Sequence, residues 1–256
     1  MTTVREMRMK NSPEFLVGFR MRGTEVTRLE SFSDAVFGFA LTLLVVSLEV
    51  PKSFSDLMTT MRGVPAFAVC FAMLASIWNT HYRFCRRYGL DDGTARFLTC
   101  ALLFIVLLYV YPLKFLFTLG MNDLLFGQSA TAPLVSRGEV STLLIIYSLG
   151  FAGVYFAFTL LYFHAWRLRD GLGLSDLERL DTRYLIGRLL SVSAFALIVA
   201  GVARLSWFSP WGGYVYFLIF PMLSIQRRLH MRRRAAFDFA TGAPSDQIAQ
   251  SFLSKP

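Results

Sequence analysis

Ionisable side chains are scarce in this chain, and their scarcity excludes an ordinary soluble domain. Only 17% of its 256 residues are charged, whereas 55% are hydrophobic. That hydrophobic share is larger than a soluble protein of this length can bury in one core. The composition therefore predicts a chain that lies mostly within a lipid bilayer.

Residues that carry catalytic or metal chemistry are also few. The three histidines are far apart, and the three cysteines form no C-x-x-C pair; they are Cys70, Cys85 and Cys100. The sequence contains no metal-ligand spacing, no pairing of a nucleophile with a base, and no phosphate-binding glycine loop. We therefore expect neither an enzyme, nor a metal site, nor an organic cofactor.

Long apolar stretches are what the chain has in place of these groups. A bilayer core requires about 20 apolar helical residues, and six stretches approach or exceed this length. The predicted spans are residues 32–50, 57–81, 97–119, 142–166, 184–205 and 211–225. Pro65 and Pro112 lie inside two of them, where we expect kinks, and Pro221 lies near the end of the sixth. The predicted fold is all-α, an integral membrane protein with six transmembrane helices.

Basic residues are concentrated on one side of these predicted spans. Of the 26 lysines and arginines, 21 fall in the N-terminal segment, the loops after spans two and four with the adjoining helix ends, and the C-terminal tail. Lys and Arg accumulate in cytoplasmic loops, so both termini are predicted to be cytoplasmic. Because the net charge of +9 follows the membrane and not one soluble face, we expect no nucleic-acid partner.

This topology predicts three parts of the chain. Residues 1–27 form a basic cytoplasmic segment, residues 28–234 form the six-helix domain, and residues 235–256 form a flexible cytoplasmic tail. The arginines at 232–234 are interpreted as a cytoplasmic stop signal, with contact to anionic lipid as the alternative.

A carboxylate near the start of the first span is the most informative single residue. Asp34 exposed to lipid would cost at least about 2.5–3.5 kcal/mol, so it should face protein or water and have a partner. Trp78, Asn79 and His81 of the second span offer donors for it. Ser33 or Asp34 acting only as a helix cap is the simpler alternative. For His81 the alternatives are a structural histidine and a proton sensor.

Beyond Asp34, helical spacing places one hydroxyl within an apolar stripe. The stripe comprises Phe39, Thr42, Leu43 and Val46. It is interpreted either as a packing face or as the lining of a pore. Glu49 lies roughly 22 Å beyond Asp34 at 1.5 Å per residue, so acidic groups would attract cations at both ends. A ring of such helices would form an apolar constriction that gates by dewetting.

The start of this span resembles the R-x-x-x-F-S-D signature that opens the first helix in the transmembrane protein 175 family of potassium channels. The matching residues are Arg28, Phe32, Ser33 and Asp34. The closing residues 49–51 and the Trp-x-x-His-x-x-Phe pattern at 78–84 are also similar to bacterial members. Spans three to six match only in hydropathy.

The resemblance implies a homotetramer with one six-helix repeat per chain, in the bacterial inner membrane. It also implies that the first helices line a central pore without a T-V-G-Y-G carbonyl filter, a motif this sequence lacks. By position, the narrowest apolar ring falls at Phe39, where most members have Ile or Leu, and a polar layer falls at Thr42. The family pattern assigns to one group the role of holding neighbouring helices in register: Arg28, Phe32, Ser33, Asp34 and His81.

The leading functional hypothesis is a potassium-permeable cation channel. In it the Thr42 hydroxyls and water replace part of the hydration of the permeant potassium or other monovalent cation, while Phe39 and Val46 set the width. Its expected partners are further copies of the chain and membrane lipid. The alternative is a proton- or cation-coupled transporter that uses Asp34 and His81 as a relay.

Overall fold

The computed structural model describes residues 19–46, 52–126, 137–204 and 214–240 of the chain. Within these residues all regular secondary structure is helical, which confirms the predicted all-α class. In chain order the helices are α2 (Arg28–Val46), α3 (Phe54–Arg62), α4 (Val64–Tyr88), α5 (Gly93–Phe126), α6 (Arg137–Arg167), α7 (Asp176–Val202), the 3-10 helix η3 (Tyr214–Leu218) and α8 (Ile219–Ala240).

Four of the described helices are long and apolar enough to cross a membrane. They are α4, Gly93–Thr118 of α5, Glu139–Arg167 of α6, and α7. In α2 the charged residues Arg28, Glu30 and Asp34 all lie in the first two turns. In α8 a series of arginines interrupts the apolar sequence. Membrane spans at α2 and α8 therefore stay predictions.

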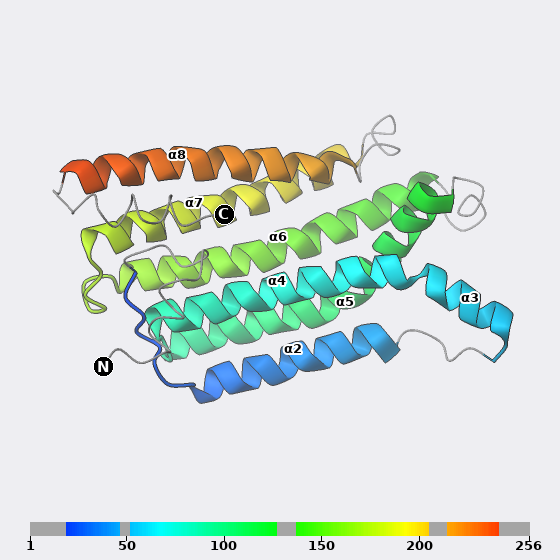
Figure 1. The fold of residues 1–256 in the computed structure, drawn as a ribbon, viewed down its shortest axis with the longest axis horizontal. Helices are drawn as coiled ribbons and strands as arrows, with labels where there is room; N and C mark the ends of the chain where they lie inside the picture. Colours follow the sequence, from blue (N-terminus) through cyan, green and yellow to red (C-terminus); the bar gives the residue numbers. More distant parts are fainter. Residues whose placement is uncertain (1–18, 47–51, 127–136, 205–213, 241–256) are drawn as a thin grey trace, which may run out of the picture.

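The long helices lie side by side in one elongated bundle (Figure 1). α6 packs on α5 and on α7, α2 packs on α4 and α5, and α8 packs on α7. α2 and α8 consequently form opposite edges of the bundle (Figure 1). Each of these two helices has a side that no other described helix of the chain covers.

A glycine allows α5 and α6 to approach closely. A Cβ atom added at Gly150 of α6 would collide with Cδ2 of Tyr109 on α5. The Tyr109 ring is buried and also packs against Tyr147, with 5.5 Å between the ring centroids. Any side chain at residue 150 would have to displace this ring, so the glycine sets the spacing of the two helices.

The second predicted span, residues 57–81, has the wrong bounds. α3 ends at Arg62 and α4 begins at Val64, with Gly63 between them and Pro65 in the first turn of α4. Proline lacks a backbone N–H and its fixed φ suits the first turn, where that N–H has no partner within the helix. Pro65 therefore begins a helix and does not kink one.

The sixth predicted span, residues 211–225, is also wrong in extent. Within the described residues η3 leads directly into α8, and Pro221 lies in the first turn of α8 and not near its end. α8 then continues through the arginines to Ala240, past residue 235 where the tail was predicted to begin. Arginine ends an apolar stretch but favours a helix, and the buried His230 and Arg234 hold this part of α8 against α7.

The first helix likewise begins earlier than its apolar sequence. α2 starts at Arg28, not at residue 32, and residues 47–50 of the predicted span lie outside the described part. The additional turn contains Glu30, which is buried and pairs with Arg86 of α4. A charge that is paired inside the bundle does not end a helix, although it ends an apolar stretch.

Candidate functional site

One face of α2 is packed into the bundle. Ser33, Phe37, Ala40 and Leu44 are buried, and they recur every three or four residues as one side of a helix. This side contacts α4 and α5. The packing fixes the rotation of α2 and therefore determines which residues face away from the bundle.

The opposite face of α2 is open. The side chains of Phe39 and Val45 are 56% and 50% exposed, and Thr42 between them is also exposed. On the same side, no heavy atom lies within 4 Å of a Cβ added at Gly38. Within the described part of the chain no helix covers this face, so it is available to lipid, to another subunit or to water.

Thr42 presents its hydroxyl on this open face. Its Oγ1 donates a hydrogen bond to the Phe39 carbonyl oxygen at 2.7 Å. A hydroxyl has one donor and two acceptor lone pairs, so this bond uses the proton and leaves oxygen lone pairs for other partners. The face therefore combines bulky apolar groups with a hydroxyl oxygen that can coordinate a cation.

The predicted stripe agrees only partly with the open face. Phe39 and Thr42 lie on it, whereas Leu43 is half-buried at its border. The side chain of Val46, and the whole of Glu49, lie outside the described residues. Hydropathy indicated the stripe, but it could not distinguish an open apolar residue from a packed one.

The carboxylate predicted to need a partner has one. The Trp78 indole Nε1 donates to Oδ1 of Asp34 at 2.7 Å, which joins α2 to α4. Ser33 is buried beside it and donates to the Leu29 carbonyl oxygen at 2.7 Å. The pair of Asp34 and Trp78 lies at the same end of α2 as the R-x-x-x-F-S-D pattern.

The other predicted members of this network form no hydrogen bond with Asp34 in the described part of the chain, although the Asp34 charge acts on His81. His81 is buried, with Nε2 3.4 Å from Oγ1 of Thr99, and so lies between α4 and α5. Asn79 is half-buried and its carbonyl oxygen accepts from Arg83 Nε at 3.4 Å. Arg28 and Phe32 are exposed on α2.

Comparison with known proteins identifies the family of this fold and this helix. A family model described as the endosomal/lysosomal potassium channel TMEM175 matches residues 28–112. A potassium channel of Marivirga tractuosa is 38% identical over 233 residues, which cover 84% of this chain and 92% of the relative. The chain belongs to the TMEM175 family. A potassium channel of Chamaesiphon minutus is 24% identical over 190 residues, which cover 68% of this chain and 84% of the relative.

A solved TMEM175 structure has the same fold. The crystal structure of a variant of the potassium channel MtTMEM175 superimposes with a TM-score of 0.72 at 34% identity, covering 84% of this chain and 97% of the other. The predicted family is confirmed, and with its four apolar helices this TMEM175 chain is a multi-pass membrane protein.

One ion pair that the sequence did not reveal fixes the start of the first helix in this TMEM175 chain. Glu30 Oε1 lies 3.2 Å from Arg86 Nη2, and the two side chains are 4% and 15% exposed. Arg86 also donates from Nη1 to the Gly23 carbonyl oxygen at 3.0 Å. An acidic residue at the start of an apolar span was the available signal, but its partner is far away in the sequence.

Side chains that could ligate a metal ion are dispersed in the described part of this TMEM175 chain. No group of three or more His, Cys, Asp or Glu side chains there is arranged to hold a metal ion.

Proposed function

We propose that this chain is one subunit of a potassium-permeable cation channel in which four copies place α2 around a central pore. The observation that carries the proposal is the open face of α2. It combines the exposed Phe39 side chain with the Thr42 hydroxyl, whose oxygen lone pairs are available to coordinate a cation. Membership in a family of potassium channels supports the ion. In this proposal the pore needs no filter of backbone carbonyls.

The proposed division of roles follows from the two kinds of side chain on this face. The Phe39 side chains form the apolar ring that sets the width of the pore. This ring gates by dewetting, because aromatic carbon does not replace the hydration water of the ion. Thr42 lies one turn farther along, where its oxygen replaces part of the hydration shell. Leu43 and Val46 extend the wall, and Glu49 attracts cations at that mouth.

The polar end of α2 has a positioning role in this proposal. The hydrogen bond between Trp78 and Asp34 and the ion pair between Arg86 and Glu30 hold α2 against α4. Arg28 and Phe32 lie exposed near that end, which suits contacts with a neighbouring subunit.

The proposed location is the bacterial inner membrane, with six spans including α2 and α8, both termini cytoplasmic, and lipid around the tetramer. The concentration of basic residues on one side supports this orientation. The geometry favours a channel over a coupled transporter. In the transporter alternative Asp34 and His81 would pass protons, whereas Asp34 bonds to Trp78 and His81 lies near Thr99.

Flux into liposomes tests the proposal. The purified protein is reconstituted, a potassium gradient drives the flux, and parent is compared with Thr42→Ala, Thr42→Ser and Phe39→Ala. We expect Thr42→Ala to change the rate or the potassium-to-sodium ratio, Thr42→Ser to preserve both, and Phe39→Ala to increase the rate by widening the ring. Phe156→Ala is the matched control, because Phe156 is 49% exposed on α6, away from the proposed pore. Unchanged flux in both Thr42→Ala and Phe39→Ala would exclude α2 as the pore wall.

A further inference from the structure

A partly open basic cavity lies between helices of the bundle, away from the open face of α2. It has a volume of about 130 Å³ and is lined by residues of α4, α6 and α7 and by Leu223 of α8. Its polar lining includes Arg83, Arg87, Arg188, Tyr155 and Tyr162. None of the lining residues is acidic.

Helical spacing directs these groups to one place. Arg83 and Arg87 are one turn apart on α4, and Tyr155 and Tyr162 are two turns apart on α6. The charges of Arg87, Arg83 and Arg188 all act on the Tyr162 hydroxyl. Three positive charges from two helices therefore share one electrostatic environment with a phenol donor.

Arg87 is the clearest sign that a ligand is needed. The residue is only 3% exposed, and its Nε has no hydrogen-bond partner among the described residues. Its guanidinium lies 5.0 Å from the centroid of the Phe19 ring, a contact that offers no counter-charge. Neither Arg87 nor Arg188 forms an ion pair within the described part of the chain. A buried charge without a partner is strongly unfavourable, which favours an anion in the cavity.

We propose that this cavity binds a phosphate group, carried either by an anionic phospholipid or by a free phosphate ion. Guanidinium groups present paired donors that match phosphate oxygens, and tyrosine hydroxyls add further donors. The cavity also has apolar lining from Leu189, Val192 and Leu223, which suits the beginning of an acyl chain. Basic pockets between transmembrane helices bind phospholipid head groups in the same manner.

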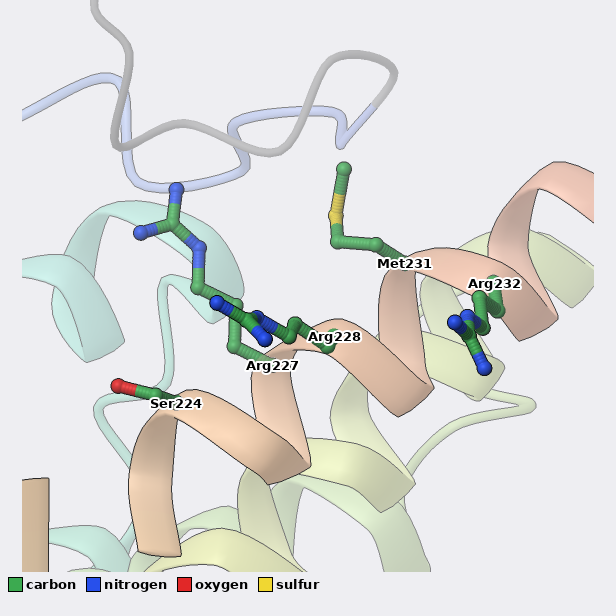
Figure 2. A pocket seen from close by; sticks show the side chains of 5 residues that line it. All are labelled: Ser224, Arg227, Arg228, Met231 and Arg232. Atoms are coloured by element: carbon green, nitrogen blue, oxygen red, sulfur yellow. The ribbon is translucent and has the colours of Figure 1, made fainter. Parts of the chain in front are cut away.

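The arginines on α8 form a separate and weaker candidate. Ser224, Arg227, Arg228, Met231 and Arg232 line an open depression of about 450 Å³, and Figure 2 shows their side chains projecting from successive turns of α8. These arginines are exposed, so water can satisfy them. They therefore provide a matched control, with the same charge outside the cavity.

Two variants and one control test the site in the full-length protein. Arg188→Gln removes one cavity charge, and Leu223→Trp fills the cavity without changing charge. Arg228→Gln removes an equal charge from the depression on α8. The delipidated protein in detergent is titrated with phosphatidylglycerol, followed by native mass spectrometry, and separately with radiolabelled inorganic phosphate in equilibrium dialysis.

We expect phosphatidylglycerol to bind at least about tenfold more weakly to Arg188→Gln and Leu223→Trp than to the parent, and unchanged to Arg228→Gln. Weakening of inorganic phosphate binding alone, in the same two variants, would support the same site with a free ion as its ligand. Equal binding of both probes to the parent and to the two cavity variants would overturn the proposal. Weakening by Arg228→Gln in place of the cavity variants would also overturn it. Neither readout depends on ion flux, so the result is independent of the proposed pore.

Discussion

Trp78 of α4 joins this helix to α2 through one hydrogen bond. Its indole N–H donates to the Asp34 carboxylate, and replacing the tryptophan by phenylalanine keeps the aromatic bulk while removing the donor. A hydrogen bond to a charged group contributes about 1.5–3 kcal/mol, and Asp34 is exposed, so we expect Trp78→Phe to cost about 1–2 kcal/mol. A melting curve in detergent measures this, together with the fraction of protein that assembles.

Trp166→Phe is the control for that change. Trp166 lies at the end of α6, and its ring packs under the guanidinium of Arg169 with 5.0 Å to the ring centroid. Phenylalanine can retain such a contact, so the control should melt close to the parent. Equal melting temperatures for Trp78→Phe and Trp166→Phe would contradict a positioning role for the Asp34 bond.

Asp92 makes stability depend on pH in the acidic range. It lies between α4 and α5, outside the spans, and its Oδ2 is 2.9 Å from His164 Nε2. Burial acts to raise the pKa of Asp92, but the hydrogen bond and charge of His164, with backbone donors, lower that pKa below its ordinary value of 3.8. The stabilisation is therefore complete above the ordinary pKa and is lost as the pH falls through the lower folded value.

Replacing Asp92 by asparagine should show this dependence. Asparagine can still accept from the Thr94 backbone N–H, so the change removes mainly the charge. We expect Asp92→Asn to melt below the parent at neutral pH, and the difference to shrink as the pH falls below about 4. Asp91→Asn, at the exposed neighbouring residue, should match the parent throughout. A difference that is constant with pH would argue against the role of the Asp92 charge.

At the scale of helices, the contact of α5 with α6 depends on Gly150. A Cβ there would meet the buried Tyr109 ring, and forcing extra atoms into a packed core costs about 1–3 kcal/mol. We expect Gly150→Ala to lower the melting temperature in detergent. Gly187→Ala is the matched control, because no heavy atom lies within 4 Å of a Cβ added there on α7. Equal melting temperatures for the two variants would show that the bundle has room for a methyl group beside the Tyr109 ring.

The sequence predicts helices better than it predicts where they begin or which way they face. Apolar length located the cores of α4 to α7, because a bilayer-spanning helix needs a long apolar stretch. Hydropathy could not place the break at Gly63, since Pro65 is compatible both with a kink and with a first turn. It also could not detect that Leu43 is half-buried, because an apolar residue fits a core, lipid or a pore wall equally.

Polar contacts were predictable only where one partner was conspicuous. A carboxylate near the start of an apolar span demanded a donor, and Trp78 was among the residues proposed for Asp34. The pair of Asp181 with His230, 3.0 Å apart between α7 and α8, was missed. It joins residues far apart in the sequence, and no local spacing indicates such a pair.

At the scale of the whole molecule, charged groups tie the ends of the helices together. Arg22 Nη2 lies 2.7 Å from Oε2 of Glu178, which links the segment before α2 to α7. Asp181 contacts both His230 and Arg234, which links α7 to α8. These pairs lie at the end of the bundle where the sequence concentrates its basic residues, so that end is fixed while the open face of α2 stays available for assembly.

Assembly of subunits around α2 should give Thr42 and Ile198 different access to water, although both side chains are exposed in the single chain. In one subunit Thr42 is exposed on α2 and Ile198 is 64% exposed on α7. In a tetramer with α2 at the axis, Thr42 would face a water-filled pore and Ile198 would face lipid.

A water-soluble cationic thiol reagent should therefore modify Thr42→Cys in membranes and reduce potassium flux, and leave Ile198→Cys unmodified. Both substitutions are made with Cys100→Ser, since Cys100 is exposed whereas Cys70 and Cys85 are buried. Modification of Ile198→Cys but not of Thr42→Cys would place α2 against lipid. We expect the native mass of the complex to equal four chains. With α2 against lipid, another interface would have to hold those four chains together.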